Sequence, residues 1–503
     1  MNTPRRHVAA AASALLLLGA GCANTADSSA DVPALRYAAV GAPAATATDP
    51  HGRVGNESDY TRFAMLYDVL TYPDENGGIQ PRLAVSWDSE DLTTWAVTLR
   101  DDAVFSDGTP VTAEDVLFSL RRIQGKGAEN NGRLSMFDLD ASATTGEHTL
   151  DLVTKGPYAE FASAVASLTF VVPEGSDDFT GDPVPGSGPF TDTGEGDDTT
   201  AVLTRNDAWW GSTPGVERLE ILAMPDAQTR AEAVASGQAD AAGSISPATA
   251  SRYEEQDGFT VLRRPGAVNY PLVMDTRTEP FDDPDVRRAV KLALDRDQLV
   301  QTVFLGFGEP GTDVLSPNEP TSPDAAPVRR DLAEAERLLE ESGRADGIEL
   351  TLTTTNSYPG MEEAATLAAE QLGEAGIDVT VEVHPPDTYW TEVWNVEPFY
   401  LNSLGGSGFV DFARMALLSE GPINETGWTD ADFDADFQEA LATADDARRG
   451  ELLGALQSTV ADEGGYVVWG LGDGLDLIAE GVRGMPTGPG FNRIFIENAT
   501  VGG

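Results

Sequence analysis

The stretch that decides the fold runs Trp95-Ala-Val-Thr-Leu-Arg-Asp-Asp-Ala-Val-Phe-Ser-Asp-Gly-Thr-Pro-Val-Thr-Ala-Glu-Asp115. Its first six residues alternate between core-facing and outward-facing positions, which predicts a half-buried strand. Asp107-Gly108 is typical of a tight turn. The residues from Thr112 to Asp115 predict the capped start of a helix. The stretch therefore predicts a strand, a turn and a helix in succession.

Outward from this stretch, strands and helices alternate along the chain. In Phe281-Asp-Asp-Pro284 the aspartate before the proline is predicted to be a helix N-cap, and the proline the first helical residue. Residues 348–352 and 379–383 alternate as strands, and residues 361–372 between them form a helix rich in Ala and Glu. This order predicts one β-α-β unit with parallel strands. The predicted fold class is α/β with more than one lobe.

The N-terminal segment has the features of an export signal. An arginine pair precedes an apolar run over residues 8–20 that is too short to span a bilayer, so residues 1–21 are predicted to be a signal peptide. Cys22, the single cysteine, follows small residues and resembles the lipidated cysteine of a bacterial lipobox. Small polar residues predict a lipid-anchored flexible tether over residues 22–33. An ordinary signal peptide with an incidental cysteine is the alternative, and the arginine pair leaves Sec and twin-arginine export both open.

The composition argues against several function classes. The 503 residues include 32 Lys and Arg against 83 Asp and Glu, which gives a formal net charge of −51. Such a charge argues against a nucleic-acid partner, because phosphate binding needs a basic surface. Four His and one Cys leave little room for a Cys/His metal site, so neither a metal nor a cofactor is expected.

Local motifs for nucleotide binding, calcium binding and catalysis are weak. Gly306-Phe-Gly-Glu-Pro-Gly311 has the spacing of a dinucleotide loop but follows a predicted helix and contains a proline, which favours a helix stop. The acidic run from Asp430 to Asp436 lacks the glycine of a calcium loop and predicts the acidic first turn of a helix. The sequence offers no combination of nucleophile and base. The chain is therefore not predicted to be an enzyme.

The chain resembles a known family over about residues 35–485. The stretch from Leu83 to Ile123 is similar to the signature of the bacterial extracellular solute-binding proteins of family 5, which include dipeptide, oligopeptide and nickel receptors of ABC importers. Further similar motifs are Pro185-Gly-Ser-Gly-Pro-Phe190, Arg205-Asn-Asp-Ala-Trp-Trp-Gly211, Ser236-Gly-Gln-Ala-Asp240 and Phe281-Asp-Asp-Pro-Asp-Val-Arg-Arg-Ala289.

The resemblance implies a two-lobed, periplasmic-binding-protein-like fold, of type II and cluster C-like, with an inserted extra domain. The implied division is domain I over residues 34–52, 184–265 and 476–503, domain II over 53–183, and domain III over 266–475. A hinge is expected at Arg264-Pro-Gly-Ala267, between two strand-like stretches.

The resemblance also directs attention to a ligand site between the lobes. In peptide-binding members, an aspartate in a Gly-Trp-x-x-Asp type segment meets the peptide amine. The corresponding segment here, Asn402 to Phe412, has Leu404 in place of the tryptophan and keeps Asp411 at a later acidic position, where a helix N-cap is the alternative role. The family's cleft-lining loop corresponds to residues 56–60, ahead of the helix that carries Tyr67. The candidate ligand-binding residues are Asn56, Glu57, Ser58, Tyr60, Asn269, Tyr270, Trp390, Trp394, Asn402 and Asp411. For each aromatic residue, core packing is the alternative.

These observations lead to one functional expectation. The chain is expected to be an extracytoplasmic lipoprotein receptor that captures a small polar solute, a peptide in the first place, and delivers it to the transmembrane subunits of an ABC permease. It is expected to act as a monomer, to be held at the membrane through Cys22 and to bind no nucleic acid. The alternatives are a receptor for a glycoside, an opine-like compound or a metal chelate, and a binding protein used for signalling or scaffolding.

Overall fold

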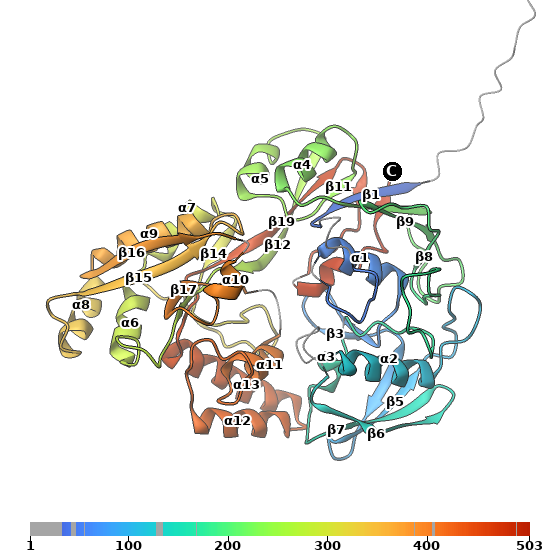
Figure 1. Cartoon of the computed structure of the whole chain (residues 1–503), viewed down its shortest axis with the longest axis horizontal. Coiled ribbons are helices and arrows are strands. Elements are labelled where there is room, and N and C mark those ends of the chain that lie inside the picture. Colours follow the sequence, from blue (N-terminus) through green and yellow to red (C-terminus); the bar gives the residue numbers. More distant parts are fainter. Residues whose placement is uncertain are drawn as a thin grey trace, which may run out of the picture. The chain divides into compact units, whose positions relative to one another are not determined.

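Figure 1 shows the computed structural model of the chain, in which residues 33–503 form one compact unit. The structure describes residues 33–41, 47–54, 56–126, 134–166, 168–386, 388–404, 408–488 and 490–502. Cys22 and the predicted signal peptide lie outside the described residues. The cleavage and lipidation of this segment therefore stay predictions.

The strand of the opening stretch belongs to a four-stranded antiparallel sheet with the order β4-β5-β7-β6, and the helix of that stretch packs against this sheet. Its elements are β4 (Ala84–Asp88), β5 (Thr94–Leu99), β6 (Phe137–Gly146), β7 (Thr149–Thr154), α2 (Ala113–Gly125) and α3 (Phe161–Ala164). Gly108 has a φ of +87°, a conformation that glycine adopts without strain. Thr112 caps α2 through a reciprocal capping box with Asp115. The predicted strand, turn and capped helix are confirmed.

A five-stranded sheet with the order β16-β15-β17-β13-β18 contains the predicted β-α-β unit. Its strands are β13 (Leu272–Met274), β15 (Ile348–Thr355), β16 (Ile377–His384), β17 (Phe399–Leu401) and β18 (Tyr466–Val467). β15 pairs in parallel with β16, and α9 lies between them in the chain, so this prediction is confirmed. The associated helices are α6 (Pro284–Ala293), α7 (Arg296–Val303), α8 (Leu332–Glu341) and α9 (Met361–Gly373). As predicted, α6 begins at Pro284 and Asp283 is its N-cap.

The largest sheet has eight strands, in the order β12-β19-β11-β1-β10-β9-β8, with β14 paired to β19. Its strands are β1 (Ala34–Ala39), β8 (Phe190–Asp192), β9 (Thr200–Arg205), β10 (Arg218–Ala223), β11 (Ala241–Ala242), β12 (Phe259–Asn269), β14 (Gly308–Pro310) and β19 (Gly470–Ala479). The helices α1 (Glu57–Leu66), α4 (Ala227–Ala235) and α5 (Pro247–Tyr253) pack against it. β1 pairs in parallel with β10 and β11.

The remaining elements are short pairs of strands and a group of helices. The strand pairs are β2 (Thr71–Pro73) with β3 (Ile79–Pro81), and β20 (Val482–Arg483) with β21 (Thr500–Val501). The helices are α10 (Tyr389–Glu392), α11 (Phe409–Phe412), α12 (Ala431–Leu441) and α13 (Asp446–Glu463), with a π-helical turn at Ala413–Leu417 and a 3-10 turn at Gly490–Ile494. Asp430 caps α12, so the acidic run is the start of a helix, as predicted.

The chain passes between the two larger sheets four times. It leaves the first sheet at Asn269, the end of β12, and enters the second at Leu272, the start of β13. It returns to the first sheet for β14, enters the second again at β15, and returns to the first once more between β18 and β19. The predicted hinge at residues 264–267 lies inside β12, where the pairing with β19 changes register. The first passage therefore lies at residues 270–271, slightly later in the chain than predicted, and the division into three domains stays a prediction.

Candidate functional site

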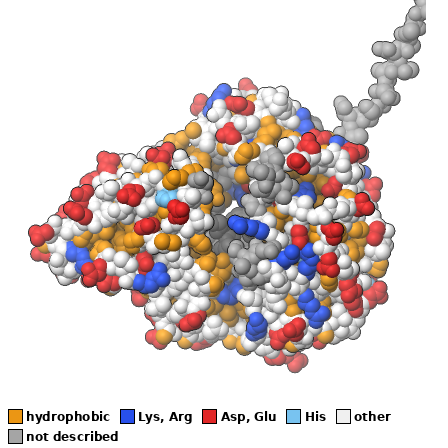
Figure 2. All heavy atoms as spheres, in the orientation of Figure 1, with side chains coloured by type: hydrophobic (Ala, Val, Ile, Leu, Met, Phe, Trp, Pro, Cys, Tyr) orange, Lys and Arg blue, Asp and Glu red, His pale blue; other side chains and the backbone are white. Residues whose placement is uncertain are grey.

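Several of the candidate residues lie near the ends of parallel strands, whereas Asn269 and Tyr270 follow β12, which pairs antiparallel with β19. The parallel strands concerned are β1 and β11 in the first sheet, and β15, β16 and β17 in the second. Open α/β sheets bind ligands outside the carboxyl ends of their strands, where loops and helix starts meet. Figure 2 shows a hollow near the middle of the face in view, with acidic side chains spread over the rest of that face.

Residues 56–60 form the first turn of α1. Asn56 is the N-cap and the helix begins at Glu57, so the prediction that this segment precedes the helix as a loop is wrong. The backbone N–H of Ser58 donates to the carbonyl of Val40, just beyond β1, at 3.0 Å. The hydroxyl of Tyr60 donates to the carbonyl of Val54 at 2.9 Å. The start of α1 is thus fixed at the carboxyl end of β1.

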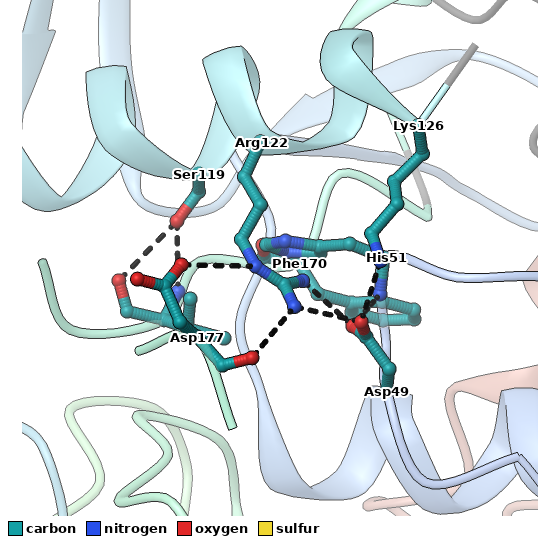
Figure 3. A network of polar contacts seen from close by, with 8 residues as sticks. Asp49, His51, Ser119, Arg122, Lys126, Phe170 and Asp177 are labelled. Atoms are coloured by element: carbon teal, nitrogen blue, oxygen red, sulfur yellow. Dashed lines mark hydrogen bonds and ion pairs between the residues drawn. The ribbon is translucent and has the colours of Figure 1, made fainter. Parts of the chain in front are cut away.

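The loop that leads into α1 is fastened to α2, as Figure 3 shows. Arg122 donates to both carboxylate oxygens of Asp49 at 2.7 Å, and Lys126 lies 3.2 Å from the same carboxylate. His51 is buried, with its Nε2 2.7 Å from the carbonyl of Phe170. These contacts hold the segment before the candidate residues in one position.

Glu57 is buried among polar groups that neutralise it. Its Oε1 accepts a hydrogen bond from the Tyr37 hydroxyl at 3.0 Å, and its Oε2 accepts one from Ser244 at 3.2 Å and lies 3.2 Å from Arg493. Burial alone would raise the pKa of Glu57, but Arg493, Arg264 and the two hydroxyls hold it below its usual value. Glu57 is therefore a carboxylate with partners on both oxygens, and Ser244 at the end of β11 joins the site.

Asn269 and Tyr270 lie at the first passage between the sheets. The backbone carbonyl of Asn269 accepts from the N–H of Leu404, and that of Tyr270 accepts from the indole of Trp469 at 2.6 Å. The amide oxygen of Asn269 is buried and has no hydrogen-bond partner in the described part of the chain. An unpaired buried acceptor is costly, so it marks a place where a donor would be stabilising.

Aromatic rings form a continuous surface beside this passage. The ring of Tyr270 stacks with that of Tyr358 at 6.5 Å, and Tyr358 meets Trp390 edge-on at 6.2 Å. Tyr270 is buried, Trp390 is half-buried, and Tyr358 is 46% exposed. Trp390 is in α10, which follows the carboxyl end of β16. An exposed ring on a buried one is a surface on which a ligand can pack.

Tyr358 was missed by the sequence analysis. It follows the carboxyl end of β15 by three residues, because that strand ends at Thr355. The predicted β-α-β unit already placed a parallel strand end at this point. That topology, rather than any motif, is the signal that could have identified Tyr358.

Asn402 belongs to a buried hydrogen-bond network. Its amide donates to Glu425 at 2.7 Å, and the hydroxyl groups of Tyr400 and Tyr466 donate to the same carboxyl group. Burial raises the pKa of Glu425, although its four donors, which include Trp394, oppose the shift. Asn402 and Trp394 thus have partners within the protein.

Asp411 lies in the first turn of α11 rather than at its N-cap. The N-cap is Gly408, so the interpretation of Asp411 as a cap is wrong. The helix begins two residues before Asp411, at Phe409, whose side chain is fully buried. The carboxylate of Asp411 is partly exposed and lies 3.5 Å from Arg414. Contact with a ligand remains a prediction for Asp411, as it does for the other candidates.

The described residues contain no group of three His, Cys, Asp or Glu side chains placed to hold a metal ion. Within the same residues, no helix combines the length and apolar character needed to span a membrane.

Comparison with known proteins places this chain in a family. A model described as bacterial extracellular solute-binding proteins, family 5 Middle, matches residues 78–421. Protein XP55 of Streptomyces lividans is 26% identical over 469 residues, which cover 87% of this chain and 83% of that protein. The glutathione-binding protein GsiB of Escherichia coli strain K12 is 24% identical over 423 residues, which cover 80% of this chain and 82% of that protein.

A solved structure supports the fold. The periplasmic binding protein DppA of Helicobacter pylori, in complex with the peptide STSA, matches with a TM-score of 0.75 and 22% identity, covering 93% of this chain and 98% of that chain. The predicted α/β, periplasmic-binding-protein-like fold with two lobes is therefore confirmed.

Proposed function

This chain belongs to the bacterial extracellular solute-binding proteins of family 5, and we propose that the solute it captures is a peptide. As a family member it is an extracytoplasmic solute-binding receptor of an ABC importer, a transport function rather than an enzymatic one. The observation that carries the peptide proposal is the aromatic surface of Tyr270, Tyr358 and Trp390 beside the passage between the sheets.

The site suits the chemistry of a short peptide. The rings offer an apolar surface for side chains, and the unpaired amide oxygen of Asn269 offers an acceptor for an N–H group. The relatives named above include a protein that binds glutathione, itself a tripeptide, and a structure that holds a tetrapeptide. Enclosure between two lobes would pair the peptide backbone with protein groups and remove water from both.

We further propose that Cys22 is lipidated and anchors the receptor to the membrane by a flexible tether. Support comes from the apolar run before Cys22 and the small polar residues after it. Labelled fatty acid should be incorporated into the wild-type chain and not into Cys22→Ser. Equal labelling of both would contradict the anchor.

A thermal-shift panel tests the peptide proposal. Di- to pentapeptides, including glutathione and Ser-Thr-Ser-Ala, should give saturable stabilisation, of about 2.7 kcal/mol at a concentration one hundred times the Kd. A glycoside, an opine-like compound and a metal chelate form the other arms of the panel. Stabilisation by one of these, with none by peptides, would refute the peptide proposal and keep the receptor.

Transport is separated from signalling or scaffolding by an uptake measurement. Deletion of the gene should reduce uptake of the peptide that stabilises the protein most. Unchanged uptake, with binding intact, would favour the signalling alternative.

Replacing Tyr358 by Ala should weaken peptide binding by about 2- to 12-fold, because an aromatic contact is worth about 0.5–1.5 kcal/mol. The measurement is a fluorescence titration with the peptides that stabilise the wild-type chain. Val396→Ala removes another exposed apolar side chain, 63% exposed, and serves as the matched control. Equal affinity of both variants would exclude Tyr358 from the site.

A further inference from the structure

The four-stranded sheet and the helices α12 and α13 touch through their loops. The backbone N–H of Ala159, just before α3, donates to the carbonyl of Leu441, the last residue of α12, at 2.8 Å. Beside this bond, the Arg449 side chain of α13 lies 2.5 Å from the carboxylate of Glu160. Both side chains are largely buried, at 14% and 19% exposed, so solvent screens this ion pair only partly.

A second polar contact joins the same two regions. Arg414, in the π-helical turn after α11, donates to the hydroxyl of Ser135, just before β6, at 2.6 Å. Arg414 is held toward this contact by Asp411 at 3.5 Å. The two regions are therefore fastened at two points that come from different elements.

Each region is anchored to a different large sheet. On one side, Thr71 of β2 donates to the carbonyl of Ala162 in α3, and Asp68, at the end of the segment that contains α1, accepts from the N–H of Val171. On the other side, Arg287 and Lys291 of α6 donate to the carbonyls of Glu463 and Ala461 at the end of α13.

Because of these anchors, the contacts of Arg449 with Glu160 and of Arg414 with Ser135 connect the part of the chain attached to the eight-stranded sheet with the part attached to the five-stranded sheet. α1 packs on the eight-stranded sheet, whereas α6 and α13 pack with the five-stranded sheet and its strand β18. A rotation that separates the two sheets, about the four connections at residues 270–271, 275–307, 311–347 and 468–469, would pull Glu160 from Arg449 and Ser135 from Arg414. The same two regions also share one buried hydrophobic cluster, which includes Tyr158 on one side and Leu441 on the other, so the polar contacts act together with apolar packing.

We infer that Glu160 with Arg449, supported by Ser135 with Arg414, forms a latch that holds the two lobes together before any solute binds. The inference rests on the proposed function only in that the lobes close around a solute. The apparent Kd of a receptor rises as the fraction of its binding-competent state falls. The latch thus sets the affinity from a position outside the aromatic surface, and Asp411, which contacts Arg414, is a candidate ligand residue next to it.

The test measures the distance between the lobes without a solute. Spin labels are attached at Asp140→Cys in β6 and Glu349→Cys in β15, both exposed positions, in a Cys22→Ser background free of other cysteines. Pulsed electron resonance on the solute-free protein should show mainly the short distance. Arg449→Met should shift the distribution to longer distances, and Glu160→Gln should give the same shift from the opposite side of the contact.

Arg448→Met is the matched control, because Arg448 neighbours Arg449 on α13 but pairs with Glu451 on the same helix. It removes one positive charge and should leave the distribution unchanged. The latch is overturned if the wild-type distance is already long, or if Arg449→Met and Glu160→Gln both behave like Arg448→Met. Glu160→Gln keeps the test decisive if Arg449→Met does not fold. Since no solute is present, a failed peptide panel would refute the proposed ligand and leave this result standing.

Discussion

Replacing Arg82 by Met is expected to lower the free energy of unfolding by about 3–5 kcal/mol. Arg82 is 2% exposed, forms a short ion pair with Asp68 and lies 3.0 Å from Glu497. Asp68 also accepts a hydrogen bond from the indole of Trp210 at 2.6 Å. Burial alone would lower the pKa of Arg82, but the two carboxylates raise it, so it carries its charge at every accessible pH. Without it, two buried carboxylates would lose their positive partner.

A urea titration followed by tryptophan fluorescence measures this loss. Arg337→Met is the matched control, because Arg337 is 47% exposed and pairs with Glu334 and Glu341 on the surface of α8. Surface pairs of this kind contribute about 0–1 kcal/mol. Asp68→Asn combined with Arg82→Met should recover part of the stability, since it removes one of the unpaired charges. A loss below about 1 kcal/mol for Arg82→Met would show that Arg82 contributes no more than a surface ion pair and would contradict its role as the partner of two buried carboxylates.

Acidification is expected to destabilise the chain through His51. His51 is 2% exposed, and burial lowers its pKa to about 4. The positive charges of Arg122 and Lys126 also lower this pKa (Figure 3). In the unfolded chain its pKa is 6.5. Above pH 6.5 both states are neutral at this residue. As the pH falls from 6.5 to 4, only the unfolded state gains the proton, so the free energy of unfolding falls by on the order of 3 kcal/mol.

The variant His51→Gln isolates this contribution. Its side-chain amide can still donate to the carbonyl of Phe170, but it does not titrate. Denaturant titrations between pH 4 and 7 should therefore show a shallower fall of stability for the variant than for the wild type. Parallel curves would contradict a lowered pKa at His51.

Local features of the fold could be predicted from the sequence because their causes lie within a few residues. The cap of α2 at Thr112 needs only Asp115 three residues later, and the start of α6 needs only Asp283 and Pro284. The β-α-β unit follows from alternation and helix length, without knowledge of the other strands. Each of these predictions is confirmed.

Features that depend on distant partners could not be predicted. Arg82 and Glu497 are 415 residues apart in the chain, and Glu160 and Arg449 are 289 apart. No periodicity or motif reports such a pairing. The start of α1 was placed too late because Asn56 is not followed by an apolar run, whereas contact with β1 fixes the helix there.

The structure shows where the candidate residues lie, and their contact with a ligand stays a prediction. The candidates after β1, β16 and β17 lie near the carboxyl ends of parallel strands, whereas Asn269 and Tyr270 follow the antiparallel strand β12. Glu57, Trp394 and Asn402 have protein partners. Tyr358 has the exposed ring that the motif-based selection did not include. A motif identifies a family position, whereas exposure depends on the packing around it.

The central claim, that this receptor captures a peptide, is tested most directly by the molecule that accompanies it through purification. The protein is purified under native conditions, unfolded, and the released small molecules are identified by mass spectrometry. We expect one or more short peptides, in an amount that falls when Tyr358 is replaced by Ala. A released glycoside, opine-like compound or metal chelate in place of peptides would contradict the claim.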